Sequence, residues 1–73
     1  MDKITRAKVK LEVANLRILA ASQRQTGDAY RRQACKPIYP GQEMICLGKA
    51  NQADAFAARS EAQADLVEAE AGI

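Results

Sequence analysis

The chain has 73 residues and a net charge of only +2, but this charge is unevenly distributed along the sequence. Residues 1–42 carry nine bases and three acids, whereas residues 43–73 carry two bases and six acids. Leu, Ile, Val and Phe together supply 14 residues and Ala supplies 15, which is enough for one small domain of modest stability. No apolar run approaches the roughly 18 residues of a membrane span, and no apolar signal region opens the chain. We therefore expect a cytoplasmic protein.

The first segment, residues 4–21, fits two periods. Between residues 6 and 13, apolar and charged residues alternate, which is typical of a half-buried strand. A helix would instead place six residues at heptad spacing on one face: Ile4, Ala7, Leu11, Ala14, Ile18 and Ala21. It would also place a second apolar stripe on the opposite side: Val9, Val13, Leu16 and Ala20. Because a small monomer has little material to cover two stripes, we favour a strand over residues 5–13, with a helix between partners as the alternative.

Turn residues divide the middle of the chain. The polar run 22–28 contains Gly27 and predicts a chain reversal there. The sequence Tyr39-Pro40-Gly41-Gln42 has Pro and Gly at the second and third positions, as a type II turn requires. The apolar run after it predicts a strand over residues 43–47, so the central unit is expected to be an imperfect β-hairpin.

The last third of the chain is rich in alanine. Residues 50–71 contain no Gly or Pro, and nine of these 22 residues are Ala, which favours a helix capped by Asn51 or Asp54. Four acids would form one stripe on this helix, which is most simply a solvated face: Asp54, Glu61, Asp65 and Glu68. Because the apolar side is mostly alanine, we expect one folded domain over residues 1–59 and a frayed or flexible acidic tail over residues 60–73. The predicted fold class is α+β, a small antiparallel sheet or hairpin with an Ala-rich C-terminal helix; a mainly helical fold is the alternative.

The sequence offers little catalytic chemistry. It contains no His, which removes the commonest general base and metal ligand. Cys35 and Cys46 could supply only half of a zinc site, and buried free thiols are favoured over a cross-strand disulfide between them. The four Gly do not form a phosphate-binding loop. We therefore expect no enzymatic activity, no cofactor, no metal and no small-molecule substrate.

The basic half of the chain is the candidate binding surface. Seven residues are predicted to contact a partner: Lys3, Arg6, Lys8, Lys10, Arg17, Arg31 and Arg32. On a strand, Arg6, Lys8 and Lys10 would lie on one face at intervals of about 7 Å. Such a surface suits an acidic protein or the phosphates of nucleic acid, and an ordinary solvated face is the simplest alternative. We favour a protein, because Tyr30 and Tyr39 are the only aromatic residues near these bases that could stack on nucleobases. We expect no membrane partner.

The segment from Tyr39 to Leu47, followed by the Ala-rich stretch with Asp54, resembles the hairpin-then-helix ending of small phage-encoded proteins. It covers about a quarter of the chain. In length, in its basic first half and in its lack of catalytic groups, the chain is similar to the small RNA polymerase-binding transcription regulators of Xanthomonas phages. This resemblance implies a non-enzymatic protein of the host cytoplasm that binds RNA polymerase, inhibits initiation and promotes antitermination. An inhibitor of a host defence nuclease is a further alternative with the same sequence features.

Overall fold

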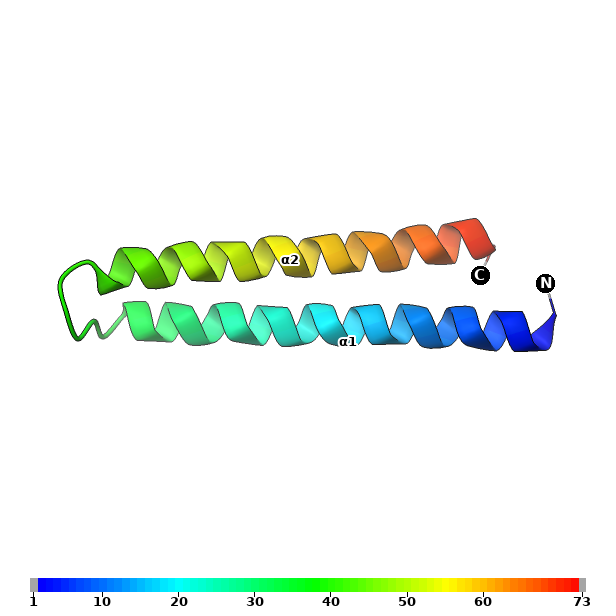
Figure 1. The fold of residues 1–73 in the computed structure, drawn as a ribbon, viewed down its shortest axis with the longest axis horizontal. Helices are drawn as coiled ribbons and strands as arrows, with labels where there is room; N and C mark the ends of the chain where they lie inside the picture. The colour runs from blue at the N-terminus through cyan, green and yellow to red at the C-terminus, as the bar shows by residue number, and fades with distance from the viewer. Residues whose placement is uncertain (1, 73) are drawn as a thin grey trace.

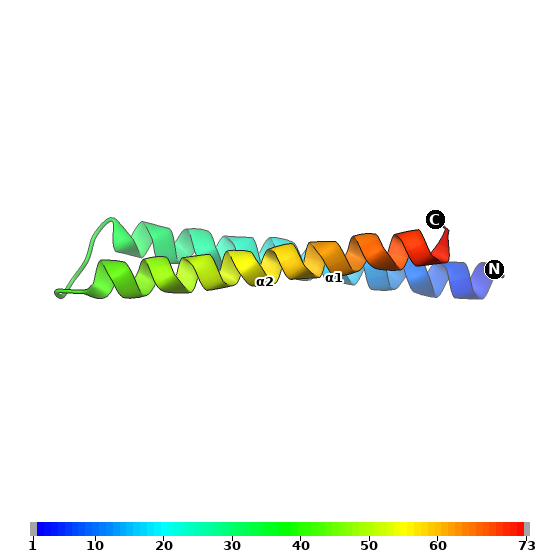
Figure 2. The ribbon, with the colours of Figure 1, turned by 90° about the horizontal axis from the view of Figure 1, so that it is seen from above.

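The computed structural model describes residues 2–72 as a helical hairpin, in which two long helices lie antiparallel and side by side (Figure 1). Helix α1 spans Lys3–Ala34 and helix α2 spans Gln42–Ala71. The hairpin measures 57 × 14 × 10 Å and its radius of gyration is 16.6 Å, well above the about 11 Å of a compact chain of this length. Seen from above, the two helices cross at a shallow angle (Figure 2). Each helix therefore packs on one side only.

The predicted α+β fold is wrong, and the mainly helical alternative fits the structure. Residues 5–13 are helical, and so are residues 43–47, the other predicted strand. The alternation over residues 7–13 arises within a helix. Val9 and Val13 face α2, and each of them stands two positions after an apolar residue that faces away from α2, Ala7 and Leu11. Two positions are about 200° around a helix, so the two stripes lie on opposite sides and together give a false period of two.

Three further expectations are corrected. The chain does not reverse at Gly27, which lies inside α1. Residues 43–47 are helical, so the predicted β-hairpin ending that supported the phage resemblance is also absent. Helix α2 begins at Gln42 and not at a cap near Asn51. It continues to Ala71, which includes most of the predicted tail; fraying of residues 60–73 stays a prediction, and Met1 and Ile73 lie outside the described residues.

The predicted turn is confirmed, but it joins two helices. Gly41 has φ +87° and ψ −9°, as the third position of a type II turn requires. The Gln42 backbone N–H donates to the Tyr39 carbonyl oxygen at 3.2 Å, which closes the turn. At the other end of α1, the Asp2 side chain accepts a hydrogen bond of 2.7 Å from the Thr5 backbone N–H, and this cap lowers the pKa of Asp2. Gly72, at φ +72°, ends α2.

Small side chains fill the seam between the helices. From α1, the seam receives residues spaced alternately by four and three: Val9, Val13, Leu16, Ala20, Gln23, Gly27, Tyr30 and Ala34. From α2, it receives Cys46, Ala50, Ala53, Ala57, Ser60, Ala64, Val67 and Ala71. This is the heptad spacing of a coiled coil. Ala50, Ala57 and Ala64 have no exposed surface, whereas no large side chain in the described residues is fully buried. The two helices therefore approach closely, but the seam between them buries little apolar side-chain surface.

Two seam positions fix how closely the helices approach. A Cβ atom on Gly27 would lie 3.3 Å from the Ala50 carbonyl oxygen and 2.9 Å from the Asp54 Oδ1 atom. Farther along, the Ser60 hydroxyl donates a hydrogen bond of 3.1 Å to the Gln23 side-chain oxygen. Since a buried polar pair is stable only when it is matched, this bond favours one register.

We expect Gly27→Val to reduce the free energy of unfolding by about 1–3 kcal/mol, because the added side chain overpacks the seam against the Ala50 backbone. Gly48→Val is the matched control, since nothing lies within 4 Å of the Cβ position there. It should change the stability by less than about 0.5 kcal/mol, the range of ordinary surface substitutions. Thermal unfolding followed by circular dichroism measures both, and equal losses would contradict the close approach at Gly27.

Candidate functional site

Three arginines of α1 pair with the acidic stripe of α2, and we call this set the arginine ladder. Arg24 reaches Glu61 through two hydrogen bonds of 2.9 and 3.0 Å. The flanking pairs are Arg17–Glu68, supplemented by Arg17–Asp65 at 3.1 Å, and Arg31–Asp54. Along α1 the pairs advance by seven residues, and along α2 they retreat by seven. The ladder therefore repeats with the period of the seam and marks the antiparallel register.

The ladder corrects one expectation about the acids of α2. The stripe on one helix face is present, but it is not simply a solvated face, since Asp54, Glu61 and Glu68 all pair with α1. Hydrogen bonding to Arg24 lowers the pKa of Glu61, and the bond to Glu61 raises the pKa of Arg24. These side chains stay partly exposed, so each pair is screened by salt and weak alone.

The seven predicted partner residues fall into two groups, those that form ion pairs with α2 and those that do not. Arg17 and Arg31 are engaged by the acids of α2. The other five form no ion pair within residues 2–72: Lys3, Arg6, Lys8, Lys10 and Arg32. Arg32 lies near the connection, whereas the other four lie in the first turns of α1, at the end of the hairpin where both termini lie (Figure 1). The unpaired positive charge is thus concentrated at the start of α1.

Lysines border an apolar stripe on the side of α1 that faces away from α2, which we call the outer stripe. Its members are Ile4, Ala7, Leu11, Ala14, Ile18 and Ala21, and all of them are exposed. Ile4, Leu11 and Ile18 are 70%, 62% and 67% exposed. Lys3 and Lys10 precede members of the stripe by one position and Lys8 follows one, so the lysines lie on its two edges. Arg6 is three positions from Lys3 and four from Lys10, so it adjoins the edge that carries these two lysines and lies away from Lys8.

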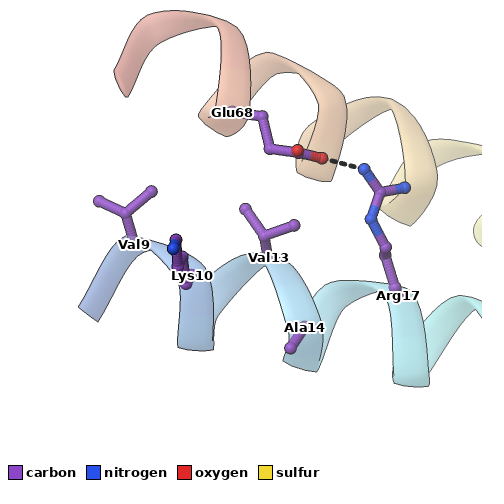
Figure 3. A pocket seen from close by; sticks show the side chains of 6 residues that line it. All are labelled: Val9, Lys10, Val13, Ala14, Arg17 and Glu68. Carbon is purple, nitrogen blue, oxygen red and sulfur yellow. Dashed lines mark hydrogen bonds and ion pairs between the residues drawn. The ribbon is translucent and has the colours of Figure 1, made fainter. Parts of the chain in front are cut away.

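Hollows flank the outer stripe on both sides. The first, of about 230 Å³, is lined by Val9, Lys10, Val13, Ala14, Arg17 and Glu68. Figure 3 shows Val9 and Val13 pointing from α1 toward α2, with Arg17 reaching Glu68. The second, of about 460 Å³, is lined by Lys8, Leu11, Glu12, Asn15, Leu16 and Leu19. Each hollow has a mostly apolar floor and a lysine at its rim.

Other chemistry is sparse in the described part of the chain. The expectation of two buried thiols is wrong for Cys35, which is exposed, whereas Cys46 is buried; both are free thiols. The disulfide geometry considered for a β-hairpin does not apply to two helices. Among residues 2–72, no three Cys, Asp or Glu side chains are grouped as a metal site would need. Neither helix has the length and apolarity that crossing a membrane would require.

The comparisons identify no relatives: no family model, curated protein or solved structure matches the chain.

Two parts of this surface were missed or misjudged from the sequence. The pairing of Arg24 with Glu61, which forms the centre of the ladder, was not predicted. The spacing of seven that separates Arg24 from Arg17 and Arg31, matched by the spacing of Asp54, Glu61 and Glu68, was the signal available. The outer stripe was visible as heptad spacing, but was set aside in favour of a strand.

We expect the ladder to make stability depend on pH. Since the pKa of Glu61 is lowered in the folded state, its contribution is complete above its ordinary pKa and is lost as the pH falls through the folded value. Glu61→Gln should be less stable than the parent protein at about pH 7, and should lose less stability between about pH 7 and pH 3.

The matched control is Glu70→Gln, an exposed α2 residue without an ion pair in the described residues. Urea unfolding at each pH measures the effect. A pH dependence in Glu61→Gln equal to that of the parent would show that the central pair contributes nothing.

Proposed function

We propose that the protein is a non-enzymatic binding protein whose surface for an acidic protein partner is the start of α1. The observation that carries the proposal is the division of the bases by the arginine ladder. Arg17, Arg24 and Arg31 already have acidic partners, whereas Lys3, Lys8 and Lys10 have none within the described residues. Three lysines within eight residues attract an acidic surface and increase the rate of encounter with it.

The apolar residues between these lysines favour a protein over nucleic acid. Ile4 and Leu11 are largely exposed, and burying them on a partner removes apolar area from water. A phosphate backbone offers no comparable apolar surface. Nucleic acid is therefore the second candidate, favoured by the local charge alone.

RNA polymerase is the first partner to test, because it is bound by the phage regulators to which the chain is similar in length, in its basic first half and in its lack of catalytic groups. A small protein can block initiation or favour elongation without catalysis, since a ligand shifts an equilibrium by its differential affinity for two states. The proposal places this interaction in the host cytoplasm. It needs no cofactor and no small-molecule substrate.

Reversing the three lysines should weaken the interaction. We expect Lys3→Glu, Lys8→Glu and Lys10→Glu together to reduce binding to purified bacterial core RNA polymerase by roughly tenfold or more, because attraction becomes repulsion. The control reverses three other bases, Lys36→Glu, Lys49→Glu and Arg59→Glu, with the same change in net charge. Surface plasmon resonance at two salt concentrations measures both proteins.

The outcomes separate the candidate functions. Equal losses in the two triple variants would indicate net charge rather than a site and would contradict the proposal. Tight, steeply salt-dependent binding of duplex or single-stranded DNA or RNA, without polymerase binding, would replace it with the nucleic-acid function. If neither is bound, both candidates fall.

A further inference from the structure

We infer that the partner presents an acidic amphipathic helix, which packs along the outer stripe of α1 as the third helix of the complex. The inference rests on the proposed function, because it uses the same surface. It adds the shape of the partner segment and the pattern of its side chains. The observations that carry it are the spacing of the outer stripe, the positions of the lysines and the two hollows.

The spacing of the outer stripe selects a helix as its occupant. The six residues from Ile4 to Ala21 follow one another by three, four, three, four and three positions, the pattern that faces a partner helix in coiled coils. At a rise of 1.5 Å per residue, the stripe is about 26 Å long, which corresponds to five turns of a partner helix. On the opposite side of α1, the seam residues have the same spacing and pack against α2. Helix α1 is therefore patterned to lie between two helices.

The alternation of size along the stripe describes the partner's apolar face. Ile4, Leu11 and Ile18 recur at intervals of seven, and an alanine stands three positions after each of them. Alanine leaves room for a large side chain opposite it, so the partner helix should place Leu, Ile or Met against the alanines. The hollow beside Ala14 and the hollow beside Leu11 provide room for side chains that reach past the stripe.

The lysines beside the outer stripe indicate which charges the partner helix should carry along the edges of its apolar face. Lys3 and Lys10 lie on one edge of the stripe and Lys8 on the other, and none has an acidic partner within the described residues. In helix pairs, the residues beside the apolar seam choose the partner by charge. The edge with Lys3 and Lys10 therefore selects Glu or Asp on the incoming helix. On the other edge, Lys8 selects an acid opposite it, while Glu12 stands one turn farther along. The arginine ladder shows the same pairing within this chain, where Arg17, Arg24 and Arg31 face acids at heptad spacing.

The same charges disfavour a second copy of the chain as the occupant. An antiparallel copy would bring the edge with Lys3 and Lys10 against its own equivalent, and a parallel copy would bring it against the edge with Lys8. Both arrangements place bases opposite bases, which destabilises a helix pair. An acidic helix avoids this repulsion in either direction.

The test uses the full chain and designed peptides as probes. The first peptide, of about 21 residues, is helical, with Leu at the seam positions of three heptads and Glu on both edges. A second peptide replaces the edge Glu residues with Lys, and a third scrambles the first so that composition is kept and the heptads are lost. Fluorescence anisotropy should show the first peptide bound roughly tenfold or more tightly than the other two.

Two variants make the result specific to the outer stripe. Leu11→Gln with Ile18→Gln should weaken binding of the acidic peptide by roughly tenfold or more. The control, Met44→Gln with Leu66→Gln, changes two exposed apolar residues of α2 and should not affect binding. Circular dichroism verifies that all variants stay helical. The triple lysine reversal should switch the preference from the acidic peptide to the lysine peptide.

Several outcomes would overturn the inference. These are equal binding of the acidic and scrambled peptides, an unchanged affinity after Leu11→Gln with Ile18→Gln, and a dimer in sedimentation analysis that this double variant dissolves. Stronger binding to vesicles of anionic lipid than to the acidic peptide would assign the stripe to a membrane surface. The proposed function is judged separately: if the lysine reversal weakens polymerase binding and the Leu11→Gln with Ile18→Gln variant does not, that function stands and the helix inference falls.

Discussion

The close packing of small residues along one seam is the constraint on which the rest of this structure depends. Ala50, Ala57 and Ala64 are fully buried, and Gly27 leaves no room for a side chain against the backbone of α2. Alanine buries little apolar area, so the seam alone holds the helices weakly. The arginine ladder and the Ser60–Gln23 hydrogen bond therefore matter more here than they would beside a core of leucine, because they favour one register of an otherwise uniform seam.

The same constraint explains how much of the fold could be predicted from the sequence. The helix over residues 51–59 and the turn at Pro40-Gly41 follow from local propensity, and both were predicted; residues 60–73 were expected to be frayed or flexible. The strand over residues 5–13 was predicted because an alternating pattern is the usual mark of a half-buried strand. Here it arises from two apolar stripes on opposite sides of one helix. The absence of large core residues in the second half made a long helix partner for α1 difficult to foresee.

The candidate site was predicted in composition but not in arrangement. The basic character of the first half is evident from composition, but the only sign of which bases are paired is the matched spacing of arginines and acids. Arg17 and Arg31 were predicted to bind a partner, and in the structure they pair with the acids of α2, whereas Lys3, Lys8 and Lys10 form no ion pair within the described residues. Three arginines of α1 and three acids of α2 both recur at intervals of seven, and the paired residues are 23–51 positions apart in the sequence. This shared interval would have distinguished the paired arginines from the unpaired lysines.

The seven-residue period shared by the seam and the ladder also bears on how the length of this hairpin can change. Deleting one heptad from α1 and one from α2 at matching heights would remove one pair of the ladder and leave the others aligned, because each helix keeps its seam on the same side. A deletion in one helix alone would shift every pair beyond it. The hairpin can therefore keep its pairs aligned only when its length changes by one heptad in each helix, and the two helices have to change together.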